Sequence, residues 1–276
     1  MKRILIKFFK YLAKPHKLPK KIIDKLSYYS SFKKYNQKLY IKEQNKIFSY
    51  YSLNRKEGIR KLNEVKNKLL LNFNEDFGLS SEHEIIFSSL SLKKNIKRYK
   101  ILEIGTYDGF NARLLSNLFP NSVIDTIDLP EDDKDFVNFY NRKDQIDIFI
   151  KNRDSILSQM KNINFYSLNS LKLLNSKKKY DLIWIDGAHG YPIVCIDIIN
   201  SLHILKNDGL ILCDDIVTNI SHFNSTRMYR SIASYETLNE LKKQKIINFK
   251  LAYKRINAEN NCVEKERKFI AIVNKI

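Results

Sequence analysis

The chain has 276 residues, of which 43% are hydrophobic and 12% aromatic, and its formal net charge is +19. This hydrophobic content is enough for a packed core and excludes a wholly disordered chain. Only 7 Gly and 5 Pro residues occur, which favours long regular elements over a low-complexity or all-β chain. The length fits one large domain, or one domain with an appendage.

The positive charge is concentrated in the first third of the chain. Residues 1–100 hold 25 Lys and Arg against 8 Asp and Glu, whereas residues 101–276 hold 24 and 22. Such a basic block predicts contact with an anionic surface, namely a membrane, a glycan or a nucleic acid; the alternative is a solvated helical face. Because no uncharged run reaches 18 residues, we expect no membrane-spanning helix.

The basic region has a helical pattern. Residues 1–13 predict a short amphipathic helix that can lie on an anionic membrane or pack against the chain's own domain. Residues 22–71 are rich in Lys and Tyr with few helix breakers, which predicts two or three helices. Ser80 or Ser81 can then cap a further helix that carries acidic residues in its first turn.

From residue 100 onward, apolar runs alternate with helical spacing, which predicts βαβ units and a mostly parallel sheet with helices on both faces. Two further β-like runs close the chain without a helix between them, which predicts an antiparallel hairpin. We therefore expect a basic helical region over 1–78 and an α/β domain with a seven-stranded sheet over 79–276. The five predicted parallel strands are 100–105, 122–129, 163–169, 180–186 and 209–215.

A glycine turn follows the first predicted strand, in the segment ILEIGTYDGF at 101–110. Gly105 allows a tight turn and a close approach of a ligand, and the next helix presents unpaired N–H groups. Glu103 suits a ligand with a cationic amino group better than a pyrophosphate. Asp128 ends the second strand, where it can accept hydrogen bonds from both hydroxyls of a ribose or act as a turn acid. The missing Gly-x-Gly-x-x-Gly fingerprint disfavours a dehydrogenase.

Three carboxylates end the fourth and fifth strands: Asp186, then Asp214 and Asp215. Neighbouring parallel strands would bring them to one edge, where they repel each other unless a hard cation such as Mg²⁺ or Mn²⁺ intervenes. No Lys or Arg flanks them closely in sequence, so a metal site is predicted; the alternative is turn and cap residues. His189, with an ordinary pKa near about 6.5, suits a general base or lines the pocket.

The segment after the acid pair, 216–235, also carries side chains of interest. Arg227, Tyr229 and Arg230 could hold a substrate carboxylate or phosphate, and His222 is a secondary candidate for a catalytic base. The alternative interpretation is the start of a surface helix.

The segment LEIGTYDG resembles the first motif of class I S-adenosylmethionine-dependent methyltransferases, with Tyr107 in place of the middle glycine. YDLIWIDGAH and GLILCDD together are similar to the metal-dependent O-methyltransferases of the catechol and macrolide-sugar kinds. The resemblance covers residues 80–276. It implies a Rossmann-like fold with an antiparallel last strand, S-adenosyl-L-methionine as cofactor, and a hydroxyl of a small molecule, sugar or glycan unit as methyl acceptor.

The resemblance also implies roles for individual residues. His189 and Asp186 would be catalytic, with the histidine at the offset where the catechol type has a lysine base. Asp186, Asp214 and Asp215 would bind Mg²⁺ or Mn²⁺, which would chelate two substrate oxygens. The cofactor would be bound by Glu103, Gly105, Thr106, Tyr107, Gly109, Asp128, Asn169, Ser170 and Asp186.

Two other functions remain open. A nucleic-acid methyltransferase would use the basic N-terminal region to bind phosphates, but the chain has no Pro-Pro pair of the kind that amino-methylating enzymes carry after strand four. A non-catalytic membrane- or partner-binding protein on the same fold is the other alternative. The scattered cysteines Cys195, Cys213 and Cys262 indicate free thiols in a reducing compartment. We therefore expect a cytoplasmic protein, with peripheral contact to the inner membrane and homo-oligomerisation as further options.

Overall fold

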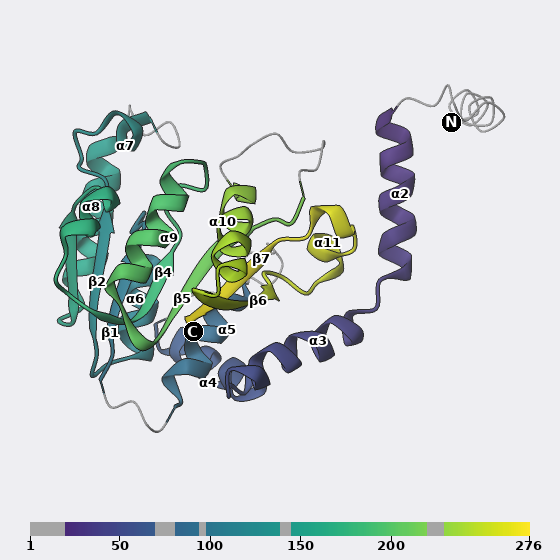
Figure 1. Ribbon diagram of the computed structural model, residues 1–276, viewed down its shortest axis with the longest axis horizontal. Coiled ribbons are helices and arrows are strands. Elements are labelled where there is room, and N and C mark those ends of the chain that lie inside the picture. The colour runs from purple at the N-terminus through teal and green to yellow at the C-terminus, as the bar shows by residue number, and fades with distance from the viewer. Residues whose placement is uncertain (1–19, 70–80, 94–97, 139–144, 220–228) are drawn as a thin grey trace.

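A computed structural model of the chain describes residues 20–69, 81–93, 98–138, 145–219 and 229–276. Its centre is a seven-stranded sheet with the order β3-β2-β1-β4-β5-β7-β6 (Figure 1). The first five strands are parallel, and β7 lies antiparallel between β5 and β6. The predicted fold is thus confirmed. The strands are β1 (Lys100–Ile104), β2 (Val123–Asp128), β3 (Ile163–Ser167), β4 (Tyr180–Ile185), β5 (Leu205–Ile216), β6 (Ile247–Tyr253) and β7 (Phe269–Lys275).

The central strands are apolar on both faces, as strands covered by helices on each side must be. In β4, every residue from Leu182 to Ile185 is at most 2% exposed. Strand β5 is longer than predicted: it begins at Leu205, which pairs with Tyr180, and passes an irregularity in register. Residues 207 and 208, which precede the predicted strand 209–215, therefore lie inside β5.

Two apolar layers cover the sheet. On one face, α4, α5 and α6 pack against β1, β4 and β5 around Trp184. On the other, α9, α10 and a 3₁₀ helix, η4, enclose Ile183 and Ile211. The described helices from residue 81 onward are α5 (Glu82–Ser91), α6 (Phe110–Leu118), α7 (Lys134–Asn138), α8 (Ile146–Ser158), η4 (Ser170–Asn175), α9 (Ile193–Ile204), α10 (Ile232–Lys243), α11 (Ala258–Asn261) and η6 (Glu264–Glu266).

The basic region forms three helices, as predicted: α2 (Lys20–Lys34), α3 (Gln37–Tyr50) and α4 (Arg55–Lys68). Helix α2 stands away from the sheet (Figure 1), whereas α3 and α4 contribute to the main core. The predicted helix at 1–13 and the predicted domain boundary after residue 78 lie outside the described residues, so both remain predictions. None of the described helices has the length and apolar character needed to cross a bilayer.

The start of α5 differs in detail from the prediction. Ser81 occupies the cap position, but its Oγ lies 2.7 Å from His83 Nδ1, and it caps no backbone N–H among the described residues. The acidic residues of the first turn pair with α4 instead, because Glu82 accepts from Arg55 Nε at 2.7 Å and Glu84 from a lysine on the same helix. These pairs fasten α4 to α5.

Candidate active site

The turn after β1 requires glycine at two positions. Gly105 has φ +101° and Gly109, which precedes α6, has φ +81°. A Cβ added to Gly105 would lie 2.5 Å from the carbonyl oxygen of Asp186, closer than any real Cβ contact. The turn that is predicted to hold the cofactor therefore packs directly on the residue that follows β4, and the tips of these two strands are held together.

Asp128 connects this turn to the tip of β2. Its Oδ2 accepts a hydrogen bond from the backbone N–H of Tyr107 at 2.8 Å, and its Oδ1 accepts one from Leu129 at 2.9 Å. These two bonds hold the carboxylate at the tip of β2, facing the glycine turn. The contact of Asp128 with a ribose remains a prediction.

Glu103 lies beneath the turn rather than in an open crevice, because its side chain is fully buried. It accepts hydrogen bonds from Asn111 Nδ2 at 2.7 Å and Thr126 Oγ1 at 2.6 Å, and Thr106 Oγ1 contacts the same threonine hydroxyl at 2.6 Å. Burial raises the pKa of Glu103 to about 7. A bound cationic amino group would favour the ionised form of this carboxyl.

This buried carboxyl predicts a specific pH dependence of stability. Because the folded pKa of Glu103 is about 7 and its ordinary value is 4.5, the folded state binds the proton more tightly than the unfolded chain. Its stabilising effect is complete below pH 4.5 and is lost as the pH rises through 7. We expect Glu103→Gln to remove this loss of stability, which is about 3 kcal/mol for a buried group.

Urea unfolding at pH 5 and pH 8 measures the change in the free energy of unfolding. Glu64→Gln, at an exposed carboxylate of α4, is the control. Equal pH dependence in all three proteins would contradict the assignment.

The loop after β3 is held by its own polar groups. Asn169 Oδ1 accepts from the N–H of Leu171 at 3.0 Å and caps η4, and the carbonyl of Ser170 accepts from Asn200 on α9 at 3.3 Å. This fixes the loop at the edge of the sheet that also carries Asp128. The contact of Asn169 and Ser170 with an adenine remains a prediction.

The structure brings the predicted catalytic cluster together. His189 Nε2 lies 3.7 Å from Asp186 Oδ1 and 3.6 Å from Asp215 Oδ2. Asp186 follows β4 and its N–H donates to the carbonyl of Ile104 at 2.9 Å. Burial and the nearby Asp214 raise the pKa of Asp186. Burial also lowers the pKa of His189, which keeps the imidazole neutral and able to accept a proton at neutral pH.

Two lysines that sequence reasoning missed complete this cluster. Lys254 Nζ lies 2.5 Å from Asp214 Oδ2 and 2.5 Å from Asp215 Oδ1, and Lys268 Nζ lies 3.0 Å from the same Asp215 oxygen. Burial alone would raise the pKa of Asp214, but the ammonium of Lys254 outweighs it and holds that pKa well below its usual range. The expectation that the acids have no basic partner is therefore wrong.

The position of the lysines follows from the C-terminal hairpin. Lys254 comes directly after β6 and Lys268 directly before β7, so both lie at the loop end of the hairpin, where the N–H of Lys254 donates to the carbonyl of Lys268 at 2.9 Å. Because β7 runs antiparallel to β5, this loop end meets the carboxyl end of β5. A basic residue at the loop end of the predicted hairpin was the available sequence signal.

Helix α3 and the start of helix α5 hold the segment that carries Lys254. Gln44 of α3 is fully buried and bonds the backbone of Tyr253 twice, accepting its N–H at 2.9 Å and donating to its carbonyl at 3.2 Å. The carbonyl of Lys254 accepts the N–H of Glu82 at 2.9 Å. Helices from the basic region thus position the lysine that neutralises the acid pair.

The arrangement does not fit the predicted divalent metal site at Asp186, Asp214 and Asp215. The ammonium of Lys254 contacts one oxygen of each member of the acid pair and supplies the positive charge that the prediction assigned to a metal ion. Within the described residues, no group of three His, Cys, Asp or Glu side chains has a geometry suited to a metal. The predicted metal site is not confirmed, and we assign no catalytic step to a metal.

One segment of the chain matches a known family. The sheet is parallel with an antiparallel strand inserted next to its edge, a glycine turn follows β1 and an acid ends β2. Residues 102–216 match the family model described as a methyltransferase domain. This segment, which runs from β1 to the end of β5, is therefore similar to a methyltransferase domain.

Solved structures similar to this chain include methyltransferases. The O-methyltransferase TomG from Streptomyces achromogenes, involved in tomaymycin synthesis, is 14% identical, with 83% of this chain and 93% of that chain covered and a TM-score of 0.49. The methyltransferase PaMTH1 from Podospora anserina is 16% identical, with 78% and 88% covered and a TM-score of 0.49. An rRNA methylase from Streptococcus thermophilus is 13% identical, with 69% and 93% covered and a TM-score of 0.44. A search of curated protein sequences finds no match. The acceptor must therefore be argued from the site of this chain.

Proposed function

We propose that the protein transfers the methyl group of S-adenosylmethionine to a hydroxyl oxygen of a small hydroxylated molecule, such as a sugar unit. The observation that supports this most strongly is the placement of His189. It is a buried, neutral histidine between two carboxylates, beside the turn that the class uses for its cofactor. A hydroxyl needs a base of this kind, since its proton must leave as its oxygen forms the new bond.

The reaction divides between the cofactor and the chain. S-adenosylmethionine supplies an electrophilic methyl on a sulfonium sulfur. The imidazole of His189 takes the hydroxyl proton while the acceptor oxygen bonds to the methyl carbon and the carbon–sulfur bond breaks. Asp215 then lies close enough to stabilise the imidazolium that forms. Positioning of the oxygen in line with the methyl group provides most of the remaining acceleration.

Lys254 has a structural role in this scheme. Its ion pairs with Asp214 and Asp215 hold these two side chains in place near His189. The site then needs no further cation to separate its acids, and we infer that methyl transfer proceeds without a divalent metal.

The proposal is tested by the product and its response to a chelator. With methyl-deuterated S-adenosylmethionine and a panel of polyhydroxylated acceptors, mass spectrometry should find the label as a methyl ether. Excess EDTA should leave the initial rate unchanged. Label on nitrogen or carbon would contradict O-methylation. Loss of activity with EDTA, restored by Mg²⁺ or Mn²⁺, would contradict the metal-independent mechanism while leaving O-methylation standing.

A further inference from the structure

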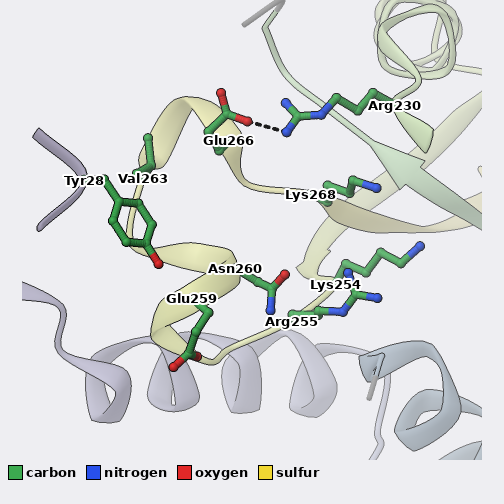
Figure 2. A pocket seen from close by; sticks show the side chains of 9 residues that line it. All are labelled: Tyr28, Arg230, Lys254, Arg255, Glu259, Asn260, Val263, Glu266 and Lys268. Carbon is green, nitrogen blue, oxygen red and sulfur yellow. Dashed lines mark hydrogen bonds and ion pairs between the residues drawn. The ribbon is translucent and has the colours of Figure 1, made fainter. Parts of the chain in front are cut away.

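A cavity of about 220 Å³ opens beside the acid pair (Figure 2). It lies between α2, α11, the start of β7 and the segment before α10. Pockets for drug-sized ligands measure roughly 300–1,000 Å³, so this one suits a headgroup or a single small unit. It is lined by Tyr28, Arg230, Lys254, Arg255, Glu259, Asn260, Val263, Glu266 and Lys268.

This cavity shares its wall with the catalytic cluster. Lys254 and Lys268 line it, and the same two lysines bond Asp215. Asp215 in turn lies 3.6 Å from His189. The ion pairs of Asp215 with these lysines are thus all that the structure places between the cavity wall and the proposed base, so the cavity adjoins the catalytic cluster.

The lining has more positive charge than its own acids neutralise, since four cationic side chains face two glutamates. Lys254 and Lys268 are paired with the acid pair, and Arg230 with Glu266. Arg255 has no ion pair among the described residues. Arg255 Nε and Arg230 Nη1 are both buried, and neither has a hydrogen-bond acceptor among the residues that the structure describes. A buried donor without an acceptor destabilises the protein, so both guanidinium groups favour an anionic ligand.

We propose that this cavity binds an anionic group of the methyl acceptor, a carboxylate or a phosphate, through Arg255 and Arg230. The acceptor is then an acidic hydroxylated molecule, such as a sugar acid or a sugar phosphate, and this assignment of the substrate class rests on the proposed O-methylation. Guanidinium groups suit either anion, because their planar N–H donors match two oxygens at once. The two lysines contribute further positive potential at the end of the cavity nearest Asp215.

The test compares acceptors that differ only in charge. Calorimetric titration of the protein with S-adenosylhomocysteine present should find that glucuronate or glucose 6-phosphate binds at least about tenfold more tightly than glucose, as one charge-assisted hydrogen bond predicts. The first arm reports a carboxylate and the second a phosphate. If both acids bind no better than glucose, the proposal is contradicted.

Variants assign the effect to the cavity. Arg255→Gln should lose the preference for the acid by about tenfold, and Arg230→Gln should reduce it as well. Arg60→Gln, at an exposed arginine of α4, is the matched control and should retain the preference. Thermal unfolding identifies any variant that does not fold, in which case the other variant decides. A folded Arg255→Gln protein with full preference for the acid would overturn the assignment.

Binding and chemistry can fail separately. If the acids bind through Arg255 but no methyl ether forms from any acidic acceptor, the proposed O-methylation fails and the anion site stands. If methyl ethers form equally well on neutral acceptors, and Arg255→Gln has no effect, O-methylation stands and the anion site fails.

Discussion

Replacing Lys254 with methionine should destabilise the protein by about 3–5 kcal/mol, the cost of breaking a buried ion pair from one side. The side chain is 10% exposed and bonds two carboxylates that are each 3% exposed. Without the ammonium, Asp214 loses the charge that keeps its pKa low, and burial would raise this pKa instead. Urea unfolding at pH 7 measures the loss.

The pH dependence of stability and a second substitution test whether the effect of Lys254→Met comes from the loss of its charge. In the wild type the low pKa of Asp214 contributes stability above its ordinary value of 3.8, which is lost as the pH falls through the lower folded value. Lys254→Met should remove this contribution, and adding Asp214→Asn should restore part of the stability at pH 7. Lys243→Met, at a lysine that is 73% exposed, is the control. Equal losses in the single and double variants would contradict a charge effect.

Replacing His189 with alanine should lower kcat by about 10²–10⁴-fold, the usual contribution of a general base. The affinity for S-adenosylhomocysteine should change little, because the ionic contacts that the structure gives His189 are with Asp186 and Asp215. Rates are measured with saturating cofactor and whichever acceptor gives a labelled ether. Calorimetry gives the cofactor affinity.

The pH profile distinguishes a base from a packing residue. Burial lowers the pKa of His189 below its ordinary value of 6.5, so the wild-type rate should fall on the acid side with a midpoint below that value. The alanine variant should lack this limb. His203→Ala, at an exposed histidine of α9, should behave as wild type. A His189→Ala enzyme with full kcat, or with an unchanged acid limb, would show that another group takes the proton.

The parallel strands and the glycine turn were predictable because their causes are local. A strand covered on both faces must be apolar throughout, as LIWI in β4 is. A turn that packs against a neighbouring backbone needs Gly105. The boundaries were less predictable: pairing with Tyr180 extends β5 back to Leu205, and that depends on a neighbouring strand.

The acidic residues of the candidate site could be predicted from the sequence, but its lysines could not. Parallel strands end at one edge, so Asp186 and the Asp214–Asp215 pair could be placed together from their positions after β4 and β5. Lys254 is 39 residues beyond Asp215, and its contact depends on the register of β7 against β5 and on the clamp by Gln44. Without that lysine, a divalent metal was the natural way to balance three carboxylates.

The sequence by itself determined the resemblance to a methyltransferase domain, because the glycine turn, the acid after β2 and the strand-end acids are each encoded within a few residues. Only the tertiary structure decided how the charges are balanced. It brought the loop end of the C-terminal hairpin to the tip of β5 and fixed it there with α3. The electrostatics of a buried site depend on every charge within a few ångströms, and residues far apart in the chain supplied them here.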